Sequence, residues 1–202
     1  MGKEGCMPSG KELAIYKAVI DLINEGADIS SMKVGEITAK AGIGKGTAYE
    51  YFQSKEEMVE KALSFYIYNQ IMAVKDLVLQ KETFREKFVT ILDYMEDNRD
   101  QIRPFLWIMR LKGEAMDISS FDTNGSSDEQ VMTAISFLVP LANWFLSYAD
   151  AEGLLKEKKE DYRISALLSQ IVQFAFYLHL GGKHDMDDLK NFIYEGFLKQ
   201  LN

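Results

Sequence analysis

The feature that most constrains this chain is a glycine-bearing turn set between two short helical segments near the N-terminus. Ile37 and Ala41 are four residues apart and place one apolar stripe on the first segment. Gly42 follows directly, where helices commonly end in a left-handed residue that glycine adopts without steric strain. The second segment starts after Gly44 and is very short. Two helices joined by such a turn can project the second one into a DNA major groove, so the pattern predicts a helix-turn-helix.

The second segment has one buried and one exposed side. Ala48, Tyr51 and Phe52 are expected to face the interior. Residues 44–47 form an N-terminus with few side chains, and its free N–H groups and positive dipole end suit a phosphate or a base edge. Ser54 with Glu57 three residues later predicts a capping box at the start of a further helix.

The run from Ile37 to Glu57 resembles the signature of the tetracycline-repressor (TetR/AcrR) family of bacterial transcription regulators, and its Lys-Gly-Thr-x-Tyr-x-Tyr-Phe core is highly specific. Residues 15–26 are similar to the family's first helix, so the resemblance covers roughly the first quarter to third of the chain. Gly44 and Lys33 stand where hydroxyl caps are common, and the segment before Lys33 is slightly longer than usual. These departures weaken local helix caps and leave the docking geometry intact.

The resemblance implies an all-α fold in two parts. Residues 9–56 would form a three-helix, helix-turn-helix DNA-binding domain, and residues 57–202 an all-helical effector-binding and dimerisation domain. A long helix from Ser54 to about Lys81 would link them. Two apolar helices, over residues 164–182 and from Met186 to Leu201, resemble the pair that builds the family's homodimer interface. Helical spacing also predicts helices over residues 83–98, 100–113 and 126–155, the last kinked at Pro140, with a loop over 114–127.

The charge distribution limits what the DNA-binding region can contact. The net charge of −8 belongs to the later region, because residues 1–55 carry seven Lys and seven Asp or Glu. There is no arginine before Arg85, so the commonest specific contact, Arg to guanine, is lacking. Lys45 to guanine and Thr47 to a base or a thymine methyl remain, whereas Glu50 is either a contact to cytosine or a solvated residue. The predicted DNA-binding residues are Thr38, Lys45, Gly46, Thr47, Tyr49, Glu50, Tyr51 and Lys55.

The resemblance further implies a small-molecule effector, held among the central helices, that changes the separation of the two DNA-binding domains. We expect it to be apolar, since an acidic body disfavours an anion. Ordinary core packing is the commoner explanation for each aromatic candidate, because apolar stripes at helical spacing mostly fill interiors. The candidate ligand-binding residues are Trp107, Arg110, Trp144, Tyr148 and His179.

Other classes of protein fit the sequence less well. Residues 44–47 resemble the end of a phosphate-binding loop, but the position five before the Gly-Lys pair holds Ala39 instead of glycine. With His179 and His184 as the only histidines, there is no Ser/His/Asp cluster and no Cys/His metal spacing. We therefore expect no enzyme, no metal and no cofactor.

The chain is expected to be cytoplasmic and not embedded in a membrane. A single cysteine, Cys6, gives no disulfide framework, and no signal peptide is recognised. The uncharged run over residues 164–182 is long enough to raise a membrane span, but its polar side chains, Ser165 and Ser169 among them, make a poor one.

Two functions therefore remain open from the sequence. The first is a ligand-responsive transcription repressor that binds a near-palindromic double-stranded DNA operator as a homodimer and is released by its effector. The alternative is a ligand-binding or protein-interaction module whose helix-turn-helix no longer binds DNA. The neutral N-terminal region and the unusual Gly44 motivate this alternative.

Overall fold

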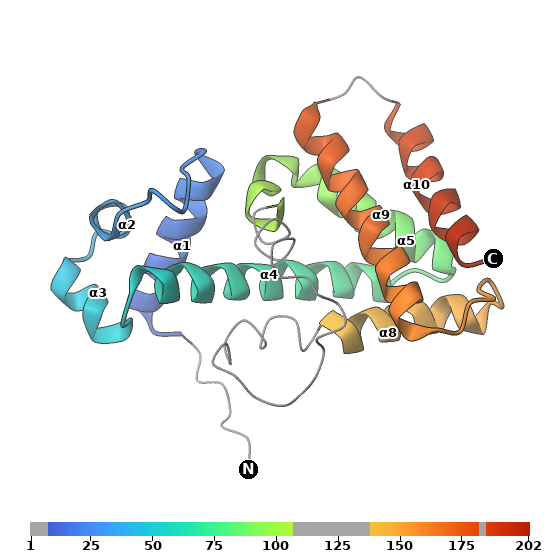
Figure 1. Ribbon diagram of the computed structural model, residues 1–202, viewed down its shortest axis with the longest axis horizontal. Helices are drawn as coiled ribbons and strands as arrows, with labels where there is room; N and C mark the ends of the chain where they lie inside the picture. The colour runs from blue at the N-terminus through green and yellow to red at the C-terminus, as the bar shows by residue number, and fades with distance from the viewer. Residues whose placement is uncertain (1–7, 107–137, 182–184) are drawn as a thin grey trace, which may run out of the picture. The chain divides into compact units, whose positions relative to one another are not determined.

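The computed structural model describes residues 8–106, 138–181 and 185–202, and every regular element in these ranges is helical (Figure 1). This confirms the predicted all-α class. The chain divides into two compact units, Met1–Asn69 and Gln70–Asn202, and the division falls inside one long helix, α4 (Lys55–Leu79). The predicted domain boundary after residue 56 rests on the sequence motif and remains a prediction.

The first unit contains α1 (Gly10–Asn24), α2 (Val34–Ala41), α3 (Lys45–Tyr51) and the first part of α4. Ser9 followed three residues later by Glu12 predicts a capping box at the start of α1, and the structure confirms it. The N–H of Glu12 donates to Ser9 Oγ at 3.3 Å, and the N–H of Ser9 donates to the Glu12 carboxylate at 2.8 Å. At the start of α4, Ser54 accepts the N–H of Glu57 at 3.1 Å, while the Glu57 carboxylate accepts the N–H of Gln53.

An aromatic cluster joins α1 to the end of α3 and the start of α4. The Tyr16 ring lies 5.9 Å from Phe52 and 5.4 Å from Phe65, centroid to centroid. Burial, together with the nearby carboxylates of Glu12 and Glu57, raises the pKa of Tyr16 to about 12, so the ring stays neutral. The buried α4 residues of this unit are Met58, Val59, Ala62 and Leu63.

The second unit is organised around a cluster of aromatic side chains. It contains the rest of α4, α5 (Phe84–Asp97), the short 3₁₀ helix η1 (Arg99–Gln101), α8 (Leu138–Ala151), α9 (Glu160–Leu180) and α10 (Met186–Gln200). Its ring centroids lie 5.1 to 6.4 Å apart, within the range of favourable aromatic pairs. The rings belong to Phe84, Phe88, Phe145, Tyr194 and Phe197.

Two contacts connect α10 to its neighbours: an ion-pair cluster with α5 and a close approach to α9. Lys190 lies within 2.5 Å of Asp93 and 2.6 Å of Glu96 on α5. Burial by itself lowers the pKa of Lys190, but hydrogen bonds and charge from the two carboxylates outweigh it and raise that pKa. Gly196 brings α10 close to α9, since a Cβ there would lie 3.2 Å from Oε1 of the buried Gln170.

The observed helices differ from the predicted ones mainly at their ends. α9 begins at Glu160, four residues earlier than expected, because Glu160 and Asp161 suit the positive end of a helix dipole. It ends before Gly181, whose φ of 66° is left-handed. After η1, residues 103–106 are helical. The rest of the predicted 100–113 helix, the 114–127 loop and the first residues of the 126–155 helix lie outside the described residues.

The uncharged stretch over residues 164–182 lies almost entirely within α9. Across the ranges that the structure describes, no helix combines the length and the hydropathy that a membrane span requires. In the same ranges, no group of three or more His, Cys, Asp or Glu side chains is placed to hold a metal ion.

Candidate nucleic-acid interface

The turn between α2 and α3 has the geometry that its glycine predicts. Gly42 ends α2 with φ 66° and ψ 29°, a left-handed conformation that strains most side chains. Its N–H donates to the carbonyl of Ala39 at 3.2 Å, and the N–H of Ile43 donates to the carbonyl of Thr38 at 3.0 Å. The turn thereby satisfies the last carbonyls of α2 and directs the chain into α3.

α3 presents one face to solvent and buries the other. Ala48 and Phe52 are fully buried, whereas the Tyr49 side chain is 53% exposed. Gly44 precedes the helix without a side-chain cap, so no hydroxyl or carboxylate of that residue occupies the first-turn amides. The exposed residues of α3 are Lys45, Gly46, Tyr49 and Glu50, and we call them, with the half-buried Thr47, the reading surface.

Two predicted DNA-binding residues lie deeper than the reading surface. Thr38 is only 3% exposed, and its hydroxyl donates to the carbonyl of Gly35 at 3.3 Å inside α2. Tyr51 is half-buried, and the Lys11 ammonium lies 5.9 Å from the centroid of its ring. The structure therefore gives Thr38 a packing role within α2.

The side chain of Lys45 lies back against the start of α2. A Cβ placed on Gly35 would be 3.0 Å from Lys45 Cε and 3.2 Å from Lys45 Nζ. The absence of a side chain at Gly35 makes room for the Lys45 stem. A larger residue at position 35 would displace the end of the Lys45 side chain.

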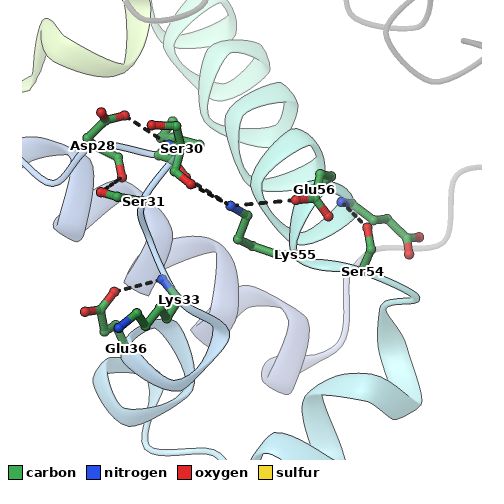
Figure 2. Close-up of polar contacts among 10 residues, drawn as sticks. Asp28, Ser30, Ser31, Lys33, Glu36, Ser54, Lys55 and Glu56 are labelled. Atoms are coloured by element: carbon green, nitrogen blue, oxygen red, sulfur yellow. Dashed lines mark hydrogen bonds and ion pairs between the residues drawn. The ribbon is translucent and has the colours of Figure 1, made fainter.

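The ammonium of Lys55 contacts the loop between α1 and α2. It donates to the carbonyls of Ile29 at 3.3 Å and Ser30 at 3.2 Å, and lies 3.7 Å from the Glu56 carboxylate (Figure 2). This contact could not be predicted from the sequence. Its acceptors are backbone atoms 25 and 26 residues away, and backbone atoms leave no pattern in the sequence.

Two of the candidate ligand-binding residues lie together in the second unit. Trp144 and Tyr148 are half-buried on α8, and their rings meet edge to face with centroids 5.4 Å apart. The Lys75 ammonium lies 5.4 Å from the Trp144 ring, and the Lys87 ammonium lies 4.6 Å from the Tyr148 ring. Lys87 is buried and also donates to the carbonyls of Val78 and Lys81.

His179, the other ligand candidate within the described residues, lies at the opposite end of α9 from a contact with α8. His179 is exposed in the last turn of α9. The first turn of α9 contacts α8 through Arg163 and Asp150, 2.5 Å apart. Sixteen residues of α-helix separate Arg163 from His179, or about 24 Å. Trp107 and Arg110 lie outside the described residues.

Both lysines beside the aromatic pair were absent from the predicted ligand-binding residues. A signal existed for Lys87, because it occupies a position between Phe84 and Phe88 on a predicted apolar stripe. Lys75 gave no such signal, since it lies on a helix with mixed polar and apolar residues.

A short exposed helix that follows a left-handed glycine turn is typical of helix-turn-helix DNA-binding regulators. Residues 20–62 match the sequence model of the bacterial regulatory proteins, tetR family. Through this N-terminal region the chain is similar to the TetR-family transcription regulators. The family comprises regulators rather than enzymes.

One curated relative matches part of the chain. An HTH-type transcriptional regulator of Staphylococcus aureus (strain MRSA252) is 28% identical over 80 residues, which are 39% of this chain and 42% of that protein. The chain thus matches less than half the length of this relative.

Solved structures share the fold over nearly the whole chain. The fatty acid degradation regulator FadR from Bacillus halodurans has a TM-score of 0.72 at 14% identity, over 96% of this chain and 97% of that one. FadR from Bacillus subtilis in complex with stearoyl-CoA has a TM-score of 0.66 at 16% identity, over 94% and 99%. A TetR family transcription regulator from Marinobacter aquaeolei VT8 has a TM-score of 0.67 at 15% identity, over 95% of each chain.

Proposed function

We propose that this protein is a cytoplasmic, ligand-responsive transcription repressor that binds a near-palindromic operator as a homodimer and is released by a small effector. The observation that carries the proposal is the exposed face of α3, which offers an ammonium, a hydroxyl and a phenol beside a helix N-terminus without a side-chain cap. Such groups suit phosphates and base edges in a major groove.

The proposed DNA contacts divide by chemistry. Lys45 and Thr47 face bases, and Glu50 either accepts from a cytosine amino group or stays solvated. Gly46, Tyr49 and Tyr51 approach the phosphate backbone, which positions the helix without carrying sequence information. Thr38 and Lys55 act in the proposed site through protein contacts. Thr38 donates to a carbonyl within α2, and Lys55 donates to the loop that precedes α2.

Exposed apolar side chains on α9 and α10 support the proposed homodimer. Phe176 and Leu180 on α9 are 52% and 76% exposed, and Phe192 on α10 is 60% exposed. Exposed apolar side chains that form a contiguous patch mark interaction surfaces. A second copy of the chain would cover them and place two α3 helices on one operator.

Binding titrations test the DNA-binding half of the proposal. The logarithm of the binding constant for random duplex should fall linearly with the logarithm of the salt concentration. The slope should be about −0.9 per neutralised phosphate. A flat line would favour the interaction module that does not bind DNA. The operator itself is obtained by selecting bound fragments from random DNA.

Thr47→Ala tests the assignment of the reading surface. Lost contact to one base should reduce discrimination at that position by about 1–3 kcal/mol, with little change on random DNA. Tyr49→Phe is the matched control, because losing a phosphate contact weakens binding to all sequences alike. If Thr47→Ala leaves the preferred site unchanged, the assigned surface is wrong.

We propose a small effector that acts near Trp144 and Tyr148. An acyl-CoA is the first candidate, because a structural neighbour holds stearoyl-CoA, and its anionic phosphates would replace the expectation of a wholly apolar ligand. Stearoyl-CoA added to the protein–operator complex is expected to lower operator affinity about 5- to 150-fold, the usual range of allosteric coupling. Trp144→Leu should reduce this effect while operator affinity without ligand is retained. Unchanged operator affinity at saturating stearoyl-CoA would contradict this assignment.

A further inference from the structure

The loop that leads into α2 lacks the cap that such a helix usually has. Lys33 precedes α2 in an extended conformation, and its side chain makes no capping hydrogen bond. A lysine carries only donors, so it cannot accept an amide as Ser, Thr, Asp or Asn do at this position. The Lys33 N–H donates to the Glu36 carboxylate at 2.8 Å, which completes only one half of a capping box.

The same loop forms a turn whose carbonyls face α4. The N–H groups of Ser30 and Met32 donate to Asp28, at 3.0 Å to its carboxylate and 2.9 Å to its carbonyl. Ile29 and Met32 are buried and anchor the turn to the core of the first unit. The carbonyls of Ile29 and Ser30 accept hydrogen bonds from the Lys55 ammonium (Figure 2).

Lys55 is fixed at the other side of this contact. It is the first residue of α4, directly after the Ser54 cap, so its backbone has little freedom. An ammonium has three N–H donors, and two of them serve the loop carbonyls of Ile29 and Ser30. At most one donor remains for a DNA phosphate.

We infer that Lys55 is a positioning residue for DNA recognition: it fastens the uncapped loop to α4 and thereby fixes where α2 begins. The link continues to the reading surface, since the second residue of α2 is Gly35 and the Lys45 side chain lies against it. A shift of the first turn of α2 would therefore change the surface against which the end of the Lys45 side chain lies. This inference rests on the proposed function.

Lys55→Met tests the inference, because methionine keeps much of the length and apolar contact of the stem but has no donor. Hydrogen exchange of amides in the first turns of α2 should become faster. Affinity for the selected operator should fall about tenfold, the expected effect of losing hydrogen bonds to a charged group. The salt slope on random duplex should stay at the wild-type value. Lys17→Met, at an exposed position of α1, is the charge-matched control.

A second substitution separates positioning from charge. Lys33→Ser supplies the missing hydroxyl cap, so in the Lys55→Met background it should restore both the slow exchange of α2 and the operator preference. A phosphate-contact role predicts the opposite, because the double variant has lost two positive charges and should bind more weakly.

Each result decides the inference. A slope reduced by about 0.9, with α2 exchange unchanged, would show a phosphate contact and overturn positioning. Failure of Lys33→Ser to restore α2 protection would overturn it as well. If the wild-type protein binds no DNA at any salt, the proposed function fails, while α2 exchange still decides whether Lys55 fastens the loop.

Discussion

Phe88→Ala is expected to lower the free energy of unfolding of the second unit by about 3–5 kcal/mol, the usual effect of removing a buried phenylalanine. Phe88 is almost fully buried, and its ring lies 5.3 Å from Phe197 and 5.4 Å from Tyr194. The substitution removes these contacts and leaves a cavity between α5 and α10. Urea unfolding followed by circular dichroism measures the change.

Leu77→Ala is the control for this experiment, because Leu77 is on α4 and 40% exposed. Substitutions at such positions usually change stability by less than about 0.5 kcal/mol. A loss of less than about 1 kcal/mol for Phe88→Ala would mean that the aromatic cluster is not the core of the second unit.

The double substitution Phe176→Asp with Phe192→Asp should convert the proposed homodimer into a monomer of 23.1 kDa. Two carboxylates in an apolar interface would be desolvated without partners, which strongly disfavours association. A monomer loses the avidity of two linked contacts, so affinity for the whole operator should drop about 10²- to 10⁴-fold. Affinity for a single half-site should be retained. Light scattering and operator titration measure the two effects.

Leu79→Asp serves as the matched control for the dimer experiment, since Leu79 is also an exposed apolar residue but lies at the end of α4. Both substituted phenylalanines are more than half exposed in the single chain, so its helical content should be preserved. An unchanged dimer mass in the double variant would place the interface on another surface.

The parts of the fold that local chemistry determines were predictable from sequence. The capping box of Ser9 and Glu12 and the left-handed Gly42 follow from residue types at fixed short spacings, and both are present. The signature from Ile37 to Glu57 further predicted the similarity to the tetR family, whose sequence model matches residues 20–62.

Contacts between distant positions were not predictable from sequence. Lys55 meets backbone carbonyls of Ile29 and Ser30, and any residue type could supply those acceptors. Helical periodicity likewise indicates which face of α10 is apolar, but not that Phe192 stays exposed while Phe197 is buried. Such outcomes depend on which helices pack together, and a single sequence does not encode that in a local pattern.

The continuity of α4 has a practical consequence for anyone who wishes to study DNA recognition on a smaller polypeptide. Met58 and Leu63 are buried within the N-terminal unit, although both lie beyond the end of the sequence motif. A truncation made where the motif ends would remove the buried Met58 and Leu63, together with Phe65, whose ring lies 5.4 Å from that of Tyr16. An autonomous miniature of the protein therefore has to retain the helix to about residue 69.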